Sequence, residues 1–348
     1  LGGIDIYRAA IAAVAGGITI NGGDKDDTLT VDFTNGSPIP TGGVTFNGDG
    51  QDASDSLFLV GGTFTTVTHN LTGVGAGNIN LDSSGSSEIF YTGLEPVNTT
   101  GSTMNNLVFN ISVAGTTDAV LADHGTSTDG ASQLKFTGAT SLEDIIFANP
   151  SGSVEINTSG TTSKVMLDLM DSGFAPTSMT FAGVADDEFL LASSNVLPDN
   201  TAVTLSTVKL NLVTFSDTIG SLAGDGPLLL GTGTLTTGGN NTNTTFSGVI
   251  SEAGGLTKEG TGTFTLSADN SAAFTGSVAV NAGTLRSENI GVLGTSAGGV
   301  TVAEGAVLEL AFGSFSTIGD ALTLDGTLHK TTAGTSAWAG TITLGASA

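Results

Sequence analysis

Short runs in which polar and apolar residues alternate strictly recur along the chain, and glycine-containing turns separate them. Residues 28–33 (TLTVDF) and 262–267 (GTFTLS) place every second side chain on one face, which is the period of a half-buried β-strand. With 52 glycines and only 7 prolines among 348 residues, this pattern predicts an all-β fold. Residues 7–15, which could also form a helix, are predicted to be a strand or a cap. Turns are predicted at four dipeptides that suit a positive φ, namely Gly22-Gly23, Asn35-Gly36, Asp49-Gly50 and Asp225-Gly226.

Internal repeats indicate that these strands stack into a solenoid. Residues 18–21 (ITIN) and 28–33 match residues 154–157 (VEIN) and 164–169 (KVMLDL) at a constant offset of 136. Repeats of this kind usually form solenoids, in which each unit contacts only its neighbours.

The same match resumes further along both copies after a deletion of one residue. PTGGVTF at residues 40–46 corresponds to PTSMTF at residues 176–181. An acidic stretch and an apolar strand follow in each copy, at residues 55–60 and 187–191. We therefore expect the first two thirds of the chain to contain two diverged copies of one module.

A different repeat follows these two copies. TIGSLAGDG at residues 218–226 returns with one insertion as TIGDALTLDG at residues 317–326. The predicted organisation has four parts. They are an N-terminal strand, cap or end of a preceding repeat, a first solenoid module, a partial second module and a region of shorter repeats, at residues 1–17, 18–153, 154–215 and 216–348.

The charge of the chain excludes several classes of partner. Thirty-three acidic residues against 8 Lys and Arg give a formal net charge of −25, which repels phosphate backbones and anionic lipids. No apolar run approaches the roughly 20 residues of a membrane span, so we expect neither nucleic-acid binding nor membrane insertion. Because only 12% of residues are charged and the mean hydropathy is +0.25, the chain must bury a substantial core. The absence of cysteine fits an extracellular bacterial solenoid.

Residues 244–286 contain, in order, an FSGVI strand, a GGLTKEG turn, a GTFTLS strand, an FTG corner and a VNAGTL strand. This segment closely resembles the autotransporter-associated β-strand repeat of bacterial surface and secreted proteins, and weaker flanks extend the resemblance to residues 216–310. The resemblance implies a right-handed parallel β-helix that forms the stalk of a passenger domain or large adhesin. We expect an elongated β-solenoid of about 20 to 25 residues per coil, with a small protruding lobe as an open alternative.

Acidic turns near the N-terminus are the candidates for a calcium site. GGDKDDTLT at residues 22–30 resembles the calcium-binding nonapeptide of RTX solenoids, although Lys25 stands where that motif has glycine. A complete calcium site needs six or more oxygen ligands, and only one such unit is present. The alternative is a pair of solvated turns without metal. The candidate ligands are Asp24, Asp26, Asp27, Asp49 and Asp52.

Residues with catalytic potential are few and scattered. His69, His124 and His329 occur singly, without the spacing of metal ligands or of a nucleophile and its base. The carboxylate run at residues 186–188 precedes an apolar strand, which is the usual place of a solvated turn. We therefore expect no enzyme activity, and a polysaccharide-active β-helix enzyme is the remote alternative.

The function that these features predict is structural, as a stalk, sheath or filament subunit on a bacterial cell surface. Because both ends of the sequence read as strands, we expect end-to-end contact with identical subunits or covalent neighbouring repeats. The alternative is an adhesin that binds a glycan or a surface protein. Residues 94–129, the longest stretch without a clear period, would then form the protruding lobe.

Overall fold

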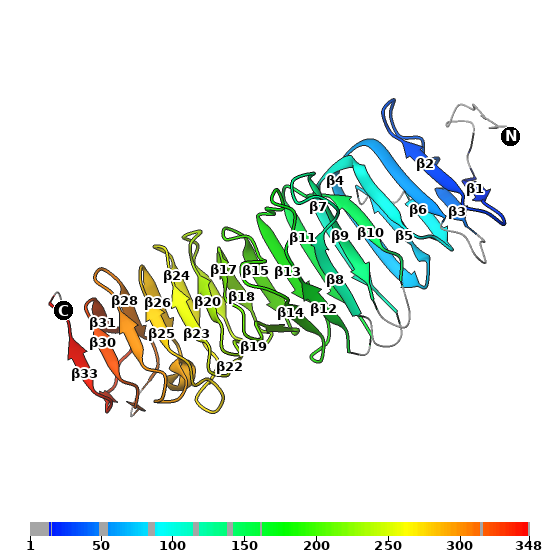
Figure 1. The fold of residues 1–348 in the computed structure, drawn as a ribbon. Helices are drawn as coiled ribbons and strands as arrows, with labels where there is room; N and C mark the ends of the chain where they lie inside the picture. The colour runs from blue at the N-terminus through cyan, green and yellow to red at the C-terminus, as the bar shows by residue number, and fades with distance from the viewer. Residues whose placement is uncertain are drawn as a thin grey trace.

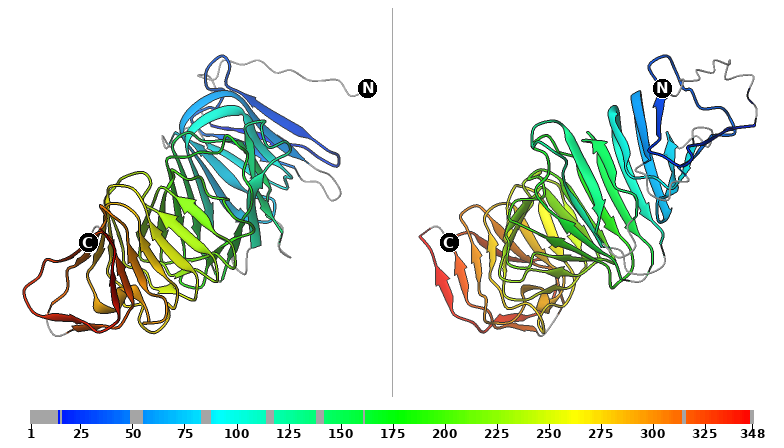
Figure 2. Two further views of the ribbon diagram at one scale, coloured as in Figure 1. Left: turned by 60° about the vertical axis from the view of Figure 1, so that its left-hand side comes forward. Right: turned by 45° about the vertical axis from the view of Figure 1, so that its right-hand side comes forward.

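The protein is an elongated all-β molecule with β1 at one end and β33 at the other (Figure 1). The computed structural model describes residue 14 and residues 16–48, 55–82, 88–113, 118–137, 142–160, 162–313 and 316–346. Within these ranges the one helical segment is a short 3₁₀ helix, η2 (Ile290–Leu293). The molecule divides into an N-terminal part with long strands and a regular coil that follows it (Figure 2).

The N-terminal part is a mixed sheet. Its strands are β1 (Ile18–Asn21), β2 (Thr28–Asp32), β3 (Val44–Asn47), β4 (Ser56–Gly73), β5 (Ala76–Leu81), β6 (Glu88–Thr92), β7 (Val97–Ile111), β8 (Asp118–Asp123), β9 (Ala131–Phe136) and β10 (Ile145–Ala148). The two longest strands, β4 and β7, lie side by side in parallel. β5 pairs antiparallel with β4 and β6, and β9 pairs antiparallel with β8 and β10. The parallel ladder is therefore interrupted by two antiparallel excursions.

From β11 onward the chain forms a coil whose strands pair in parallel from turn to turn; the first turns have two strand positions, and a third begins with β17. The first position holds β11 (Ser153–Thr158), β13 (Ser178–Ala182), β15 (Ala202–Ser206), β18 (Ser221–Gly224), β21 (Thr244–Phe246), β24 (Thr263–Leu266), β26 (Thr284–Ser287), β28 (Val307–Leu310) and β31 (Thr327–Lys330). The second holds β12 (Lys164–Leu167), β14 (Glu188–Leu191), β16 (Lys209–Asn211), β19 (Leu228–Leu229) and β22 (Ile250–Ser251), and later η2, β29 (Ser316–Ile318) and β32 (Ser336–Trp338). The third holds β17 (Asp217–Ile219), β20 (Thr234–Thr237), β23 (Gly255–Lys258), β25 (Val278–Val280), β27 (Val300–Val302), β30 (Leu322–Leu324) and β33 (Ile342–Leu344).

The register of the first position gives the length of each turn of the coil. Ala202 lies beside Ser221, which is an advance of 19 residues, and Ser153 lies beside Ser178, which is an advance of 25. The expected coil length of about 20 to 25 residues is therefore close to the observed range. The parallel pairing of the turns also agrees with the expected β-solenoid.

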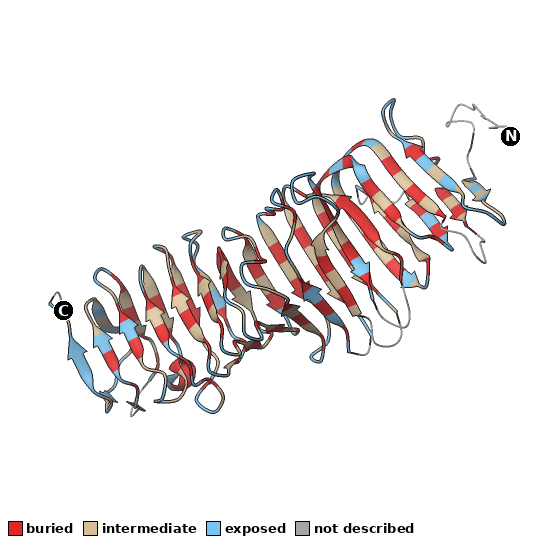
Figure 3. Cartoon of the chain, viewed as in Figure 1, coloured by how far each residue is buried: buried red, intermediate tan, exposed pale blue. Residues whose placement is uncertain are grey.

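Buried positions recur on successive strands along the length of the molecule (Figure 3), so the core runs along the axis. Ile156, Phe181 and Leu205 form one inward column across successive turns, and all three are fully buried. Phe181 also stacks on Phe189 of the adjacent face, with ring centroids 4.4 Å apart. Full burial of each such side chain stabilises the fold by about 1.5–3 kcal/mol, so the alternation seen in the sequence becomes a continuous apolar interior.

The glycine turns follow the prediction in part. Gly23 and Gly36 adopt φ values of +108° and +102°, as the Gly-Gly and Asn-Gly steps predicted. At the Asp225-Gly226 step, however, the residue with positive φ is Gly224, at +107°. A Cβ on Gly224 would lie 1.9 Å from the carbonyl oxygen of Leu205, so the close approach of the preceding turn of the coil requires glycine there.

The alternative of a protruding lobe does not hold for the described residues of the stretch 94–129. Most of this stretch forms β7 in the middle of the sheet, between β4 and β11, and then β8. Its period looked irregular because β7 is long and contains several small polar residues. Residues 7–15, predicted to be a strand or a cap, lie outside the described residues apart from Val14. The domain boundaries and the handedness of the coil stay predictions.

Candidate metal centre

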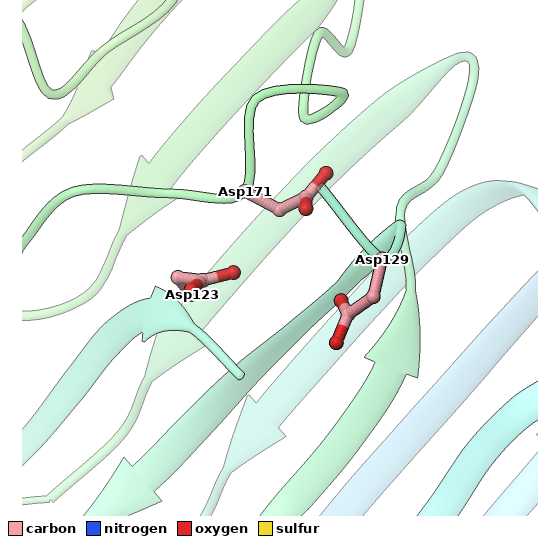
Figure 4. A group of neighbouring side chains, drawn as sticks. All are labelled: Asp123, Asp129 and Asp171. Carbon is pink, nitrogen blue, oxygen red and sulfur yellow. The ribbon is translucent and has the colours of Figure 1, made fainter. Parts of the chain in front are cut away.

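Three aspartates from separate turns meet at one edge of the N-terminal part. Asp123 ends β8, Asp129 lies in the turn before β9, and Asp171 follows β12 (Figure 4). One carboxylate oxygen from each lies within 4.8 Å of the others. The parallel pairing of β8 with β12 and the antiparallel pairing of β8 with β9 bring these distant residues together.

Hydrogen bonds hold two of the three carboxylates in place. Asp171 is buried and accepts hydrogen bonds from the Gly173 amide at 2.8 Å, the Gly130 amide at 3.2 Å and the Asn149 side chain at 2.7 Å. Asp129 accepts a hydrogen bond from the Ala131 amide at 3.0 Å. These contacts fix both side chains before any ligand arrives.

The electrostatics of the three groups differ. Burial opposes ionisation of Asp171, but its hydrogen bonds outweigh this effect and lower its pKa. Burial raises the pKa of Asp123, and the negative charges of Asp171 and Asp129 raise it further. Within the described residues, Oδ1 of Asp123 is buried without a hydrogen-bond donor. The arrangement suits a hard divalent cation such as calcium, which binds carboxylate oxygens at about 2.3–2.6 Å.

A cavity of about 680 Å³ adjoins this cluster, and Asp171 forms part of its wall. Phe174, Pro176, Asn195 and Asn200 also line it. The cavity lies between the first turns of the coil, so a ligand in it would contact the backbone of consecutive turns.

Three of the five predicted calcium ligands lie in the described part of the chain, in one turn. Asp24 and Asp26 are exposed in the turn between β1 and β2, and Asp27 is half-buried at the end of that turn. Asp49 and Asp52 lie outside the described residues. Among the residues that the structure describes, the one set of three acidic or histidine side chains within metal-binding distance is the cluster at Asp123.

The carboxylate run at residues 186–188 is split among three roles. Asp186 pairs with Lys209 at 3.3 Å, and Glu188 lies 3.9 Å from the Lys164 amino group. Asp187 is fully buried and accepts a hydrogen bond from the Ser163 amide at 2.6 Å. The run is therefore not a solvated turn throughout, since its middle residue is a buried structural acceptor.

The histidines also differ in their surroundings. His69 is fully buried and stacks on Phe109 with ring centroids 5.6 Å apart. His124 lines a second cavity, of about 360 Å³, together with Glu95, Lys135 and Asp144. No sequence pattern predicts this polar cavity, because its residues come from four separate segments.

One family model matches part of the coil. Residues 256–286 match the passenger-associated transport repeat, which confirms the resemblance predicted for this segment. The match runs from β23 through β24 and β25 to β26, and so covers one complete turn of the coil. This repeat suggests a secreted or surface passenger protein. No curated protein and no solved structure matches the chain. In the described ranges, no helix is long and apolar enough to cross a membrane.

Proposed function

We propose that the protein is a non-catalytic structural rod of a bacterial cell surface, a right-handed parallel β-helix that extends by end-to-end stacking of its turns. The observation that carries the proposal is the unbroken parallel stacking of successive turns up to β33, in a coil that contains the passenger-associated transport repeat. Ile342 and Leu344 occupy inward columns of the coil, yet they are 44% and 65% exposed. Leu322, the partner of Ile342 on β30, is 1% exposed.

The open turn at β33 offers backbone as well as apolar surface. In the described residues β33 pairs only with β30, so the amide and carbonyl groups of its other edge face outward. A further parallel strand would satisfy these groups and cover Leu344 in one step. The occupant we propose is a turn of the same kind, from an identical subunit or from a covalent neighbouring repeat.

Charge favours thin rods over bundles. A formal net charge of −25 makes two parallel rods repel each other laterally. At physiological salt this repulsion is screened beyond about 8 Å, so it acts on close lateral contacts and opposes the end-to-end contact less strongly. Heterologous contacts of this kind do not close, and they produce fibres.

The alternatives have less support. A protruding lobe at residues 94–129 would have favoured an adhesin, and most of the described residues of that stretch lie in the sheet as β7 and β8. A polysaccharide-active enzyme required a carboxylate pair, and the run at residues 186–188 is divided between ion pairs and a buried structural acceptor.

Electron microscopy and light scattering of the purified protein test the proposal. We expect rods whose length grows with concentration. Leu344→Lys should abolish this growth because it places a charge in the open inward column. Thr343→Lys, which adds the same charge on the outward row of β33, should retain it. A wild-type monomer of 34.3 kDa at every concentration and salt would contradict the proposal.

A further inference from the structure

Asp55 and Asp187 occupy matching positions in the two repeated modules. Asp55 directly precedes β4 and accepts a hydrogen bond from the Asp27 amide at 2.7 Å through Oδ1. Asp187 directly precedes β14 and accepts one from the Ser163 amide at 2.6 Å through Oδ1. Both side chains are fully buried. Each carboxylate thus joins two consecutive turns of the backbone.

The second oxygen distinguishes the two aspartates. Oδ2 of Asp187 accepts hydrogen bonds from the Thr158 hydroxyl at 2.5 Å and the Val184 amide at 2.9 Å. Thr158 is the last residue of β11, and its counterpart, directly after β1, is Gly22, which has no side chain to donate. Oδ2 of Asp55 is buried without a hydrogen-bond donor in the part of the chain that the structure describes.

Further oxygen atoms surround Oδ2 of Asp55. A Cβ on Gly48 would lie 2.5 Å from this oxygen and 2.4 Å from the carbonyl oxygen of Gly93. On the neighbouring turn, a Cβ on Gly22 would lie 2.9 Å from Oδ2 of Asp27 and 3.1 Å from the carbonyl oxygen of Gly48. One carboxylate and one carbonyl oxygen therefore lie beside each of two glycines on neighbouring turns, and the hydrogen bond between the Asp27 amide and Asp55 joins the two turns.

A buried carboxylate oxygen that faces other oxygen atoms is stabilised by taking up a proton or by binding a positive partner. Buried charges in proteins are paired or bind metal, because an isolated one costs several kcal/mol. Calcium accepts this combination of carboxylate and carbonyl oxygens, and water completes its shell.

We propose that Asp55 and Asp27, with the carbonyl oxygens of Gly48 and Gly93, bind a calcium ion at the N-terminal turn. The ion would tie the turn between β1 and β2 to the ends of β3 and β6, and it would replace the Thr158 hydroxyl of the second module. The second module, with its donor in place, binds no ion at Asp187.

Calorimetric titration of the metal-free protein with calcium chloride, together with thermal unfolding, tests this site. Asp55→Asn keeps the acceptor for the Asp27 amide, and its new amide group can donate to Gly93. We expect this variant to fold without calcium and to lose the calcium-dependent rise in Tm from this site. Asp27→Asn should weaken calcium binding about tenfold or more, because it removes a charged ligand.

Asp187→Asn is the matched control. It replaces an acceptor of two hydrogen bonds by a donor, so it should lower Tm equally with and without calcium and leave calcium binding unchanged. Gly22→Thr combined with Asp27→Ser copies the second module and should remove calcium binding while raising Tm of the calcium-free protein. Asp129→Asn identifies any heat that comes from the separate cluster at Asp123.

The proposal is wrong if calcium gives neither heat nor a rise in Tm in the wild type. It is also wrong if the response of Asp55→Asn equals that of the wild type, or if Asp129→Asn alone removes all binding.

Discussion

The N-terminal part of the molecule, β1 to β10, and the coil that follows it bury polar side chains in different ways. In the N-terminal part, His69, Tyr91 and Glu143 are fully buried, and within the described residues their side-chain polar atoms have no hydrogen-bond partners. In the coil, the Lys258 amino group donates to three backbone carbonyls. Asn270 accepts from the Ile250 amide and donates to the Val292 carbonyl.

The regular repeat supplies hydrogen-bond partners for buried polar side chains. Each inward side chain of the coil lies against the backbone of the turns before and after it, where amides and carbonyls are available. Asp217 shows the intermediate case, since one oxygen accepts from the Val196 and Leu197 amides and the other has no donor among the described residues. The long strands and antiparallel excursions of the N-terminal part leave His69, Tyr91 and Glu143 without such partners in the described part of the chain.

The largest expected effect concerns Glu143, whose burial raises its pKa to about 9, with added repulsion from Glu95 and Asp144. The unfolded carboxyl ionises near its usual value of 4.5, so the folded state holds the extra proton and stability falls as pH rises from 4.5 towards 9. Between pH 5 and pH 8 this loss is on the order of 4 kcal/mol. Urea unfolding should show the loss in the wild type and not in Glu143→Gln.

The matched control for this prediction is Glu304→Gln, at an exposed turn of the coil. It should follow the wild-type pH profile. Equal profiles for the wild type and Glu143→Gln would show that Glu143 ionises normally in the folded protein.

The second prediction concerns Lys258 in the coil, which is 1% exposed and lies within the matched repeat. Lys258→Met should reduce the free energy of unfolding by about 3 kcal/mol, because it leaves the carbonyls of Glu259, Gly260 and Ala282 without this donor. Denaturant titration measures the change. Lys135→Met, at an exposed site on β9, should change it little; equal losses in the two variants would contradict the role of these bonds.

The third prediction concerns His69, whose burial lowers its pKa to about 3. The unfolded imidazole binds a proton near its usual value of 6.5, so stability is complete above that pH and is lost as pH falls. Acidification from pH 6.5 to pH 5 should cost about 2 kcal/mol in the wild type. His69→Leu should remove this loss in unfolding measured at both pH values, whereas His329→Gln, an exposed site on β31, should retain it. Retention of the loss in His69→Leu would assign it to other groups.

The sequence predicted the coil better than the N-terminal part for a physical reason. Alternation in residues 262–267 identifies β24, and the repeat pattern identifies its neighbours, because each turn contacts only the next. The same alternation in β5 and β9 does not reveal that they pair antiparallel, since both pairings have a period of two.

The candidate sites show the same limit. The acidic turn identifies Asp27 as a candidate ligand. The sequence does not identify Asp55 as one, because its role depends on its burial and on the lack of a side-chain donor at Gly22. Asp123 and Asp171 are far apart in the sequence and have ordinary neighbours. Only the register of β8 and β12 brings them together.

The smallest expected change in the free energy of unfolding comes from a substitution on the outward face of the coil. Thr301 is the exposed middle residue of β27, between Ala279 and Thr323 of the adjacent strands, and its neighbour Val302 is fully buried. Thr301→Ala should change the free energy of unfolding by less than about 0.5 kcal/mol, since the row already tolerates alanine at position 279. Val302→Ala should cost about 2 kcal/mol, because it opens a cavity in the column. Denaturant titration of the two variants compares an outward and an inward position on one strand. A loss for Thr301→Ala as large as that for Val302→Ala would mean that another part of the assembly covers this row, and the coil could not then be a rod with a solvated outward face.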